Sequence, residues 1–163
     1  MRDEDEYSWF YRGEYQPVVR TVFLITHDRQ RAEDIAQDAF VQLYAHWKKV
    51  SGYERPEAWV RRVAIRMAVR HLKRERMRAV LERETATPSI APPVDVDLLR
   101  AMRELPVTQQ VAVVLFYFED RPISEIVHIL ETSEGAVKMA LSRARHRLAE
   151  LLGEEVNEDV HRR

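Results

Sequence analysis

The densest run of cationic side chains in the sequence lies between residues 61 and 83. This stretch holds nine basic and two acidic side chains, a balance of +7 in a protein whose formal net charge is −1. Its basic residues recur every three or four positions, which places them along one face of a helix: Arg62, Arg66, Arg70 and Lys73 or Arg74. A row of cations at this spacing is suited to binding the phosphates of a nucleic acid.

Four aromatic residues accompany this basic row: Tyr44, Trp47, Tyr53 and Trp59. Trp47 continues an apolar stripe, so we expect it in the core. Tyr53 lies in a glycine-containing loop and Trp59 at the start of a helix, and both are candidates for exposure. Cations for phosphates together with aromatic planes for unstacked bases predict binding of single-stranded or melted nucleic acid. Core packing remains the alternative for each aromatic residue taken singly.

A second basic segment, with a balance of +3 over residues 134–149, follows a tight turn. A short helix after Pro122, a turn, and a longer helix capped by Thr132 or Ser133 predict a helix-turn-helix. The outward face of the longer helix carries Lys138, Met139, Ser142, Arg143 and His146, with Arg145 and Arg147 at its flanks. Lysine and arginine donate to guanine in the major groove, and serine contacts bases or phosphates. An ordinary α-hairpin in a bundle has the same pattern, so both interpretations stay open.

Acidic and amide side chains share the outer face of the helix expected over residues 32–47: Glu33, Asp34, Gln37, Asp38 and Gln42. Paired carboxylates are one basis for acid–base or metal chemistry, but the six histidines are scattered and no pair has ligand spacing. We expect a solvated face, with a protein-docking surface as the functional alternative. The sequence therefore predicts no catalytic residue, no metal ligand and no cofactor.

These side chains must be positioned by helices, because no stretch shows the alternating pattern of a strand and only four glycines occur. Asp28 and Pro56 suit the starts of two helices. In the helix after Pro56, the expected apolar stripe consists of Trp59, Val63, Ala64, Met67 and Ala68. After Pro106, we expect one helix whose apolar stripe runs from Val107 to Phe118. The sequence therefore predicts an all-α fold.

Three of the seven prolines fall between residues 88 and 93. The stretch around them, 85–97, lacks helical periodicity and is typical of a flexible linker. It predicts two small helical domains, 1–84 and 98–163, the second containing the helix-turn-helix. The absence of cysteine excludes disulfides, and neither a signal peptide nor an apolar run of membrane-spanning length is found. We therefore expect a cytoplasmic protein with no membrane partner.

The assembled pattern resembles a known family. Residues 32–47, AEDIAQDAFVQLYAHW, and residues 52–78 resemble the second conserved region of bacterial sigma-70-type factors. Residues 98–152 resemble their fourth region, and the proline-containing stretch corresponds to the variable linker. The match is to the compact extracytoplasmic-function (ECF, group IV) type. The resemblance covers roughly residues 7–152, with two separate motifs in the expected order.

The resemblance implies roles for the residues already singled out. It implies that one helix face docks on the clamp helices of the largest subunit of core RNA polymerase: Asp34, Ile35, Gln37, Asp38 and Phe40. It implies that a second set melts and reads the minus-ten promoter element: Tyr53, Trp59, Arg62, Arg66, Arg70, Lys73 and Arg74. A third set would read the minus-thirty-five element: Lys138, Met139, Ser142, Arg143, Arg145 and Arg147. The polymerase flap and a cognate anti-sigma factor are further implied partners.

The sequence departs from the family pattern at several positions. The third helix usually reads IARNxAID, whereas here Arg66 replaces the asparagine and Arg70 replaces the final acid. Ala136 replaces the usual threonine of the recognition helix, and Val127 stands where alanine is usual.

A stand-alone helix-turn-helix regulator is the alternative function. A nuclease using Glu33, Asp34 and Asp38 is disfavoured, because these carboxylates are expected to face outward without a pocket.

Overall fold

The computed structural model describes residues 2–82 and 96–153. Within these ranges the secondary structure is helical and no strand occurs, which confirms the predicted all-α class. The chain divides into two compact units, Met1–Ser89 and Ile90–Arg163. The division falls within the predicted linker, of which residues 85–95 lie outside the described part of the chain.

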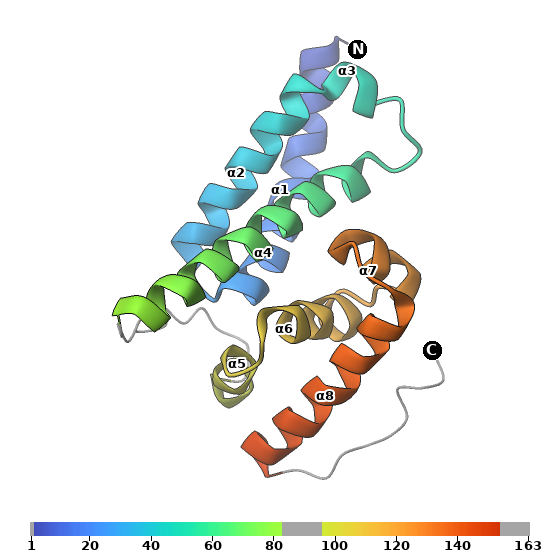
Figure 1. Ribbon diagram of the computed structural model, residues 1–163. Coiled ribbons are helices and arrows are strands. Elements are labelled where there is room, and N and C mark those ends of the chain that lie inside the picture. The colour runs from blue at the N-terminus through green and yellow to red at the C-terminus, as the bar shows by residue number, and fades with distance from the viewer. Residues whose placement is uncertain (1, 83–95, 154–163) are drawn as a thin grey trace. The chain divides into compact units, whose positions relative to one another are not determined.

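The first unit contains α1 (Asp3–Thr26), α2 (Arg29–Ala45), the short α3 (Trp47–Val50) and α4 (Pro56–Glu82). The three long helices pack against one another in pairs (Figure 1). Val22, Ile25, Phe40, Leu43 and Ile65 are among the large apolar side chains buried between them. Because each long helix contributes to one shared core, the outer faces of α2 and α4 are held on a common rigid support.

The ends of these helices follow from capping residues. His27 adopts a left-handed conformation, φ 56°, and its N–H donates to the Phe23 carbonyl, which ends α1. The Asp28 carboxylate then accepts from the Arg31 N–H at 3.1 Å and begins α2. Pro56 is the first residue of α4. The starts expected from Asp28 and Pro56 are therefore confirmed.

The buried face of α4 differs from the stripe expected from the sequence. Ala64 and Ala68 are buried as expected, but they are joined by Val60, Ile65 and Leu72. The expected core residues Trp59, Val63 and Met67 are only half-buried. The reason is that α4 packs against both α1 and α2, so its buried face is rotated and Trp59, Val63 and Met67 lie at its edge.

An aromatic cluster packs the start of α1 against the end of α2 and against α3. The Tyr7 phenol donates to the Phe40 carbonyl at 2.7 Å, and its ring lies 5.0 Å from Tyr44 and 5.4 Å from Trp47. Trp47 is buried, as expected. Burial raises the pKa of Tyr7 from 10.0 to about 12, and neighbouring Tyr11 and Tyr44 add to the shift. The neutral phenol is thus an integral part of this packing.

We expect Tyr7→Phe to lower the free energy of unfolding by about 1 kcal/mol, because it removes one hydrogen bond and leaves the ring in place. The raised pKa adds a pH dependence. Stability from the neutral phenol is fully present below pH 10, where the unfolded chain also keeps the proton, and is lost as pH rises through about 12. Urea unfolding of both proteins across this window should show a smaller alkaline loss in the variant. Tyr53→Phe, in the exposed loop, is the control and should leave the alkaline profile unchanged.

The second unit contains α5 (Val96–Arg103), α6 (Val107–Val113), the π-helix η1 (Val114–Phe118), α7 (Ile123–Leu130) and α8 (Glu134–Leu152). α8 packs against α5, α6 and α7. Pro106 and Pro122 directly precede α6 and α7, as expected. Leu105, Leu115, Ile126 and Leu141 are fully buried in its core.

The helix expected from Val107 to Phe118 is interrupted by the π-helix. A π turn holds one more residue than an α turn, so the side chains beyond it are rotated away from the expected stripe. Phe118, expected on that stripe, is therefore 40% exposed. Buried Arg121 then donates to Glu125 at 3.0 Å, which fixes the start of α7.

Across the residues that the structure describes, no helix combines the length and apolar character needed to cross a membrane.

Candidate nucleic-acid and protein interfaces

The predicted cationic row lies on the side of α4 away from the core. Arg70, Lys73 and Arg74 are exposed, whereas Arg62 and Arg66 are half-buried at the edge of the helix packing. The Arg70 Nε donates to the Arg66 carbonyl at 3.4 Å, so its side chain runs back along the helix surface. The structure therefore keeps these five cations on one accessible strip, with the strongest exposure towards the C-terminal end of α4.

One cation of the same stretch does not belong to this strip. Arg61 points towards α1 and forms an ion pair with Glu14 at 3.0 Å, with both side chains about three-quarters buried. This pair links α1 to α4 across 47 positions of sequence. The sequence does not predict this pair, because the number of charges does not show which face of the helix an arginine occupies.

The two candidate aromatic residues lie near the N-terminal end of the strip. Tyr53 is exposed in the loop before α4. Trp59 is half-buried, and its ring lies 5.7 Å from that of His46. A nitrogen of the exposed His46 ring, Nδ1, lies 2.8 Å from the Gln42 carbonyl, which fixes the ring orientation. His46 is thus an aromatic neighbour of Trp59 that the sequence does not predict.

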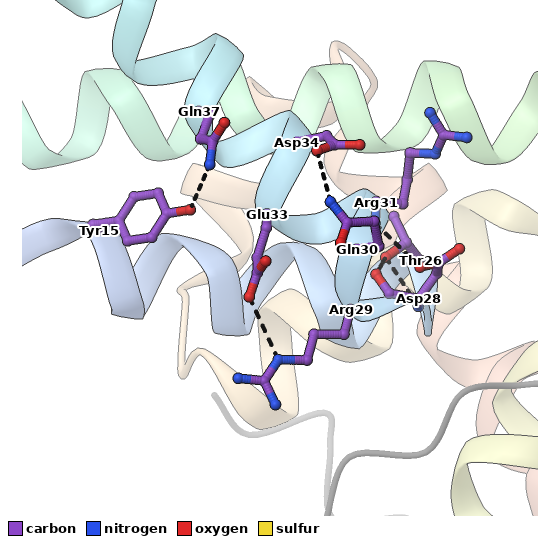
Figure 2. A network of polar contacts seen from close by, with 9 residues as sticks. All are labelled: Tyr15, Thr26, Asp28, Arg29, Gln30, Arg31, Glu33, Asp34 and Gln37. Atoms are coloured by element: carbon purple, nitrogen blue, oxygen red, sulfur yellow. Dashed lines mark hydrogen bonds and ion pairs between the residues drawn. The ribbon is translucent and has the colours of Figure 1, made fainter.

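The acidic face of α2 is accessible and carries uncompensated charge. Asp34 accepts from the neutral Gln30 side chain at 3.1 Å, Gln37 donates to the Tyr15 hydroxyl at 3.5 Å, and Glu33 pairs with Arg29 (Figure 2). Asp38 is exposed and has no hydrogen-bond or ion-pair partner among the described residues. Glu33 is therefore neutralised locally, whereas no cation among the described residues pairs with Asp34 or Asp38.

Two members of the predicted docking set do not reach the surface. Ile35 is 6% exposed and Phe40 1% exposed, because both point into the core between α1 and α2. They support the acidic face from inside, and its accessible part is Asp34, Gln37 and Asp38. Val41, 67% exposed, and Tyr44, 55% exposed, lie further along α2. The predicted docking set included neither, although Tyr44 was named among the aromatic residues near the basic row. Their helical spacing from Asp34 and Gln37 is the signal that identifies them.

The recognition-helix residues predicted on α8 are accessible to different degrees. Lys138, Met139, Arg143 and Arg147 are exposed, and Ser142 and Arg145 are half-buried. The inward face is Val137, Ala140, Leu141 and Ala144, as the apolar stripe predicts. The Ser133 hydroxyl accepts from the Ala136 N–H at 3.1 Å and begins the helix, which selects Ser133 over Thr132 as the cap. The helix-turn-helix therefore presents a cationic outer face on a buried support.

Ser133→Ala is expected to destabilise the second unit by about 1 kcal/mol, because it leaves the Ala136 N–H without its acceptor. Ser133→Asp keeps a cap and should restore stability. Ser124→Ala, an exposed serine of α7, is the control. Thermal unfolding followed by circular dichroism measures the difference. Equal unfolding temperatures for Ser133→Ala and Ser124→Ala would contradict the capping role.

The nuclease alternative requires carboxylates that can gather around a metal ion. The described residues hold no group of three or more histidine, aspartate or glutamate side chains arranged in this way. Asp34 and Asp38 instead lie along an exposed helix face, where Asp34 contacts an amide side chain of its own helix. The carboxylates of α2 are therefore spread along one face of the helix.

Comparison with family models gives two matches, one on each unit. Residues 10–78 match the model "Sigma-70 region 2", and residues 95–148 match "Sigma-70, region 4". The chain belongs to the sigma-70 family. Because curated relatives are named ECF factors, this sigma factor is of the extracytoplasmic-function type, and it acts in transcription initiation by RNA polymerase.

The relatives of this sigma factor are distant but match along almost its whole length. The ECF RNA polymerase sigma factor SigM of Bacillus subtilis is 27% identical over 158 residues, which cover 91% of this chain and 96% of that protein. SigM of Mycobacterium tuberculosis is 26% identical and covers 93% of this chain and 79% of its own length. A solved sigma factor RpoE of Bartonella quintana matches with a TM-score of 0.73 at 19% identity, covering 91% of this chain and 97% of that one. This last similarity concerns the fold.

The candidate surfaces of this sigma factor fall inside the two residue ranges that match the family models. α2 and the row from Arg62 to Arg74 fall inside region 2, and α8 up to Leu148 falls inside region 4. The departures at Arg66 and Arg70 lie on the accessible strip of α4, so they add positive charge to that strip. Ala136 is exposed in the first turn of α8, so position 136 has no hydroxyl.

Proposed function

We propose that this sigma factor binds core RNA polymerase and directs it to particular promoters by contacts with the minus-ten and minus-thirty-five elements. The observation that carries the proposal is the distribution of charge over its helices. An acidic face on α2, a cationic strip on α4 and a cationic outer face on α8 are separate surfaces, each supported by a packed core. Separate surfaces allow polymerase and two DNA elements to be bound together.

The first unit is the module for polymerase and the minus-ten element. The acidic face of α2, with Asp34, Gln37 and Asp38, docks on the clamp helices of the largest polymerase subunit. The strip on α4 holds the phosphates of the melted strand, while Tyr53 and Trp59 contact its unstacked bases. Binding to the melted state offsets the free energy of unstacking, so this sigma factor promotes opening without covalent chemistry.

The second unit is the module for the minus-thirty-five element and the polymerase flap. α8 lies in the major groove, where Lys138 and Arg143 donate to base edges and Ser142 contacts a base or phosphate. Arg145 and Arg147 lie near the backbone. A duplex reader on one unit and a melted-strand reader on the other fit a factor that acts in the cytoplasm, where polymerase and promoter DNA meet.

We also propose a cognate anti-sigma factor as a partner. The similar Bartonella quintana structure contains the sigma factor RpoE together with the anti-sigma factor NepR. Its fold is shared by this chain, which supports the same kind of inhibition here. An inhibitor that covers α2 or α8 would prevent polymerase docking or promoter binding.

Transcription from a genomic promoter library by reconstituted holoenzyme tests the proposal. The chain should bind core polymerase and yield run-off transcripts from a defined subset of promoters. No binding to core at micromolar concentration would overturn it. Tight sequence-specific binding of duplex DNA by the chain alone, as a dimer on a palindrome, would favour the stand-alone regulator instead.

A further inference from the structure

The first turn of α8 contains an ion pair that the proposed recognition role leaves unexplained. Glu134, the first residue of the helix, lies 2.8 Å from Lys138 one turn later, and both side chains are more than half exposed. Lys138 is one of the proposed base contacts. The inference below rests on the proposed function, because it concerns what this pair does when α8 lies in the major groove.

The cations of α8 differ in their partners. Arg143 is exposed and has no partner among the described residues, so it is free to meet DNA. Arg147 pairs with Glu150 at 3.2 Å, near the C-terminal end of the helix. Lys138 pairs with Glu134 at the N-terminal end, which is the part of a recognition helix that contacts base edges. Glu134 is therefore the acidic side chain placed where bases are read.

A carboxylate in the major groove has few favourable contacts. The phosphates repel it, and among the groups on the base edges it can accept hydrogen bonds only from the amino groups of cytosine and adenine. The hydrogen bond and charge of Lys138 lower the pKa of Glu134, so the ion pair favours the ionised carboxylate. An ionised Glu134 is thus repelled from a base pair unless an amino group lies within its reach.

Both Watson–Crick base pairs present an acceptor beside an amino donor in the major groove, but the Glu134–Lys138 pair matches G·C best, because lysine favours the two acceptors of guanine and a carboxylate favours the amino group of cytosine. In a G·C pair, guanine presents the acceptors N7 and O6 and cytosine presents the amino donor N4. The charged ends of Lys138 and Glu134 lie 2.8 Å apart, so lysine can donate to guanine while glutamate accepts from cytosine of the same pair. We propose that Glu134 is a specificity-determining residue that, together with Lys138, restricts one position of the upstream promoter element to a G·C pair of fixed orientation.

The same pair also reduces binding to other sequences. On DNA without that base pair, Glu134 keeps Lys138 paired and away from phosphate, and its own charge is repelled. Replacing it with neutral glutamine frees Lys138 and provides an amide that donates as well as accepts. Glu134→Gln should therefore relax the base preference and strengthen binding to unrelated sequences.

Selection by holoenzyme from promoters randomised over the upstream element tests this proposal. We expect one position with a strong G·C preference in the parent protein and a preference about tenfold weaker in Glu134→Gln. Glu150→Gln is the matched control, because it frees Arg147 by removing an acid of the same charge from the same helix. It should raise affinity for all sequences and leave the preference unchanged.

A second variant separates this inference from the proposed function. Arg143→Ala should weaken binding to the upstream element. If it does so and Glu134→Gln leaves the preference intact, the role of Glu134 is overturned while the role of α8 stands. If Arg143→Ala has no effect, α8 is not the helix that reads DNA, and the proposed roles of α8 and of Glu134 are both overturned. A loss of preference in Glu150→Gln equal to that in Glu134→Gln would also overturn the specific role.

Discussion

Asp38→Arg is expected to reduce binding to core RNA polymerase by at least about 100-fold and to abolish run-off transcription. Asp38 is exposed on α2 and has no partner within the described residues, so its charge is available to a cationic surface. Reversing it places like charges in contact, which costs several kcal/mol, and each 1.4 kcal/mol is a factor of ten. Titration of labelled protein with core polymerase, followed by fluorescence anisotropy, measures the change.

The control for this variant must change the charge equally at another exposed acid. Glu104→Arg provides it, because Glu104 is exposed just after α5 in the second unit. Both variants should unfold at the same temperature as the parent. Equal affinities of Asp38→Arg and the parent for core polymerase would show that the acidic face of α2 is a solvated surface.

The second large effect is expected for Arg70→Ala/Arg74→Ala, which removes two exposed cations from the strip on α4. Each phosphate contact contributes about 0.7 to 0.9 to the slope of log affinity against log salt concentration. At about 0.15 M salt, the loss of one such contact therefore lowers the affinity roughly fivefold. Losing two contacts should reduce open-complex formation by about 20-fold and lower the slope by about 1.4 to 1.8. Permanganate footprinting of holoenzyme on a promoter at several salt concentrations measures both quantities.

The matched control removes two cations from the outer face of α1. Arg12 and Arg20 are both exposed, so Arg12→Ala/Arg20→Ala changes the net charge equally without touching α4. It should leave the salt slope unchanged. If both double variants lower opening equally, the effect comes from overall charge and the strip has no specific role. Binding to core polymerase should be unaffected in both.

Much of the architecture was predictable because helices carry local signals. Asp28, Pro56, Pro122 and Ser133 lie at helix starts for reasons of capping and backbone geometry that act within a few residues. The all-α class followed from the same periodicity. The π-helix at Val114–Phe118 has no such signal, because an extra residue in a turn depends on how the surrounding core closes.

The candidate surfaces were predictable in outline, and their exact membership was not. The spacing of Arg62, Arg66 and Arg70 identified a helix face, but it did not show that Arg61 turns inward to Glu14. The family resemblance included Ile35 and Phe40 in a docking face, yet the packing of α1 on α2 buries both. Local spacing places a residue on a helix, and only the packing of other helices decides which side is exposed.

The division of the core between two units has a consequence for synthesis of the protein. The contacts among α1, α2 and α4 involve only the first 82 residues, so this unit can fold while the ribosome is still translating. At about 5 to 20 residues per second, synthesis from there to the end of α8 at Leu152 needs roughly 4 to 14 seconds. A nascent chain can therefore complete its N-terminal core before its helix-turn-helix exists.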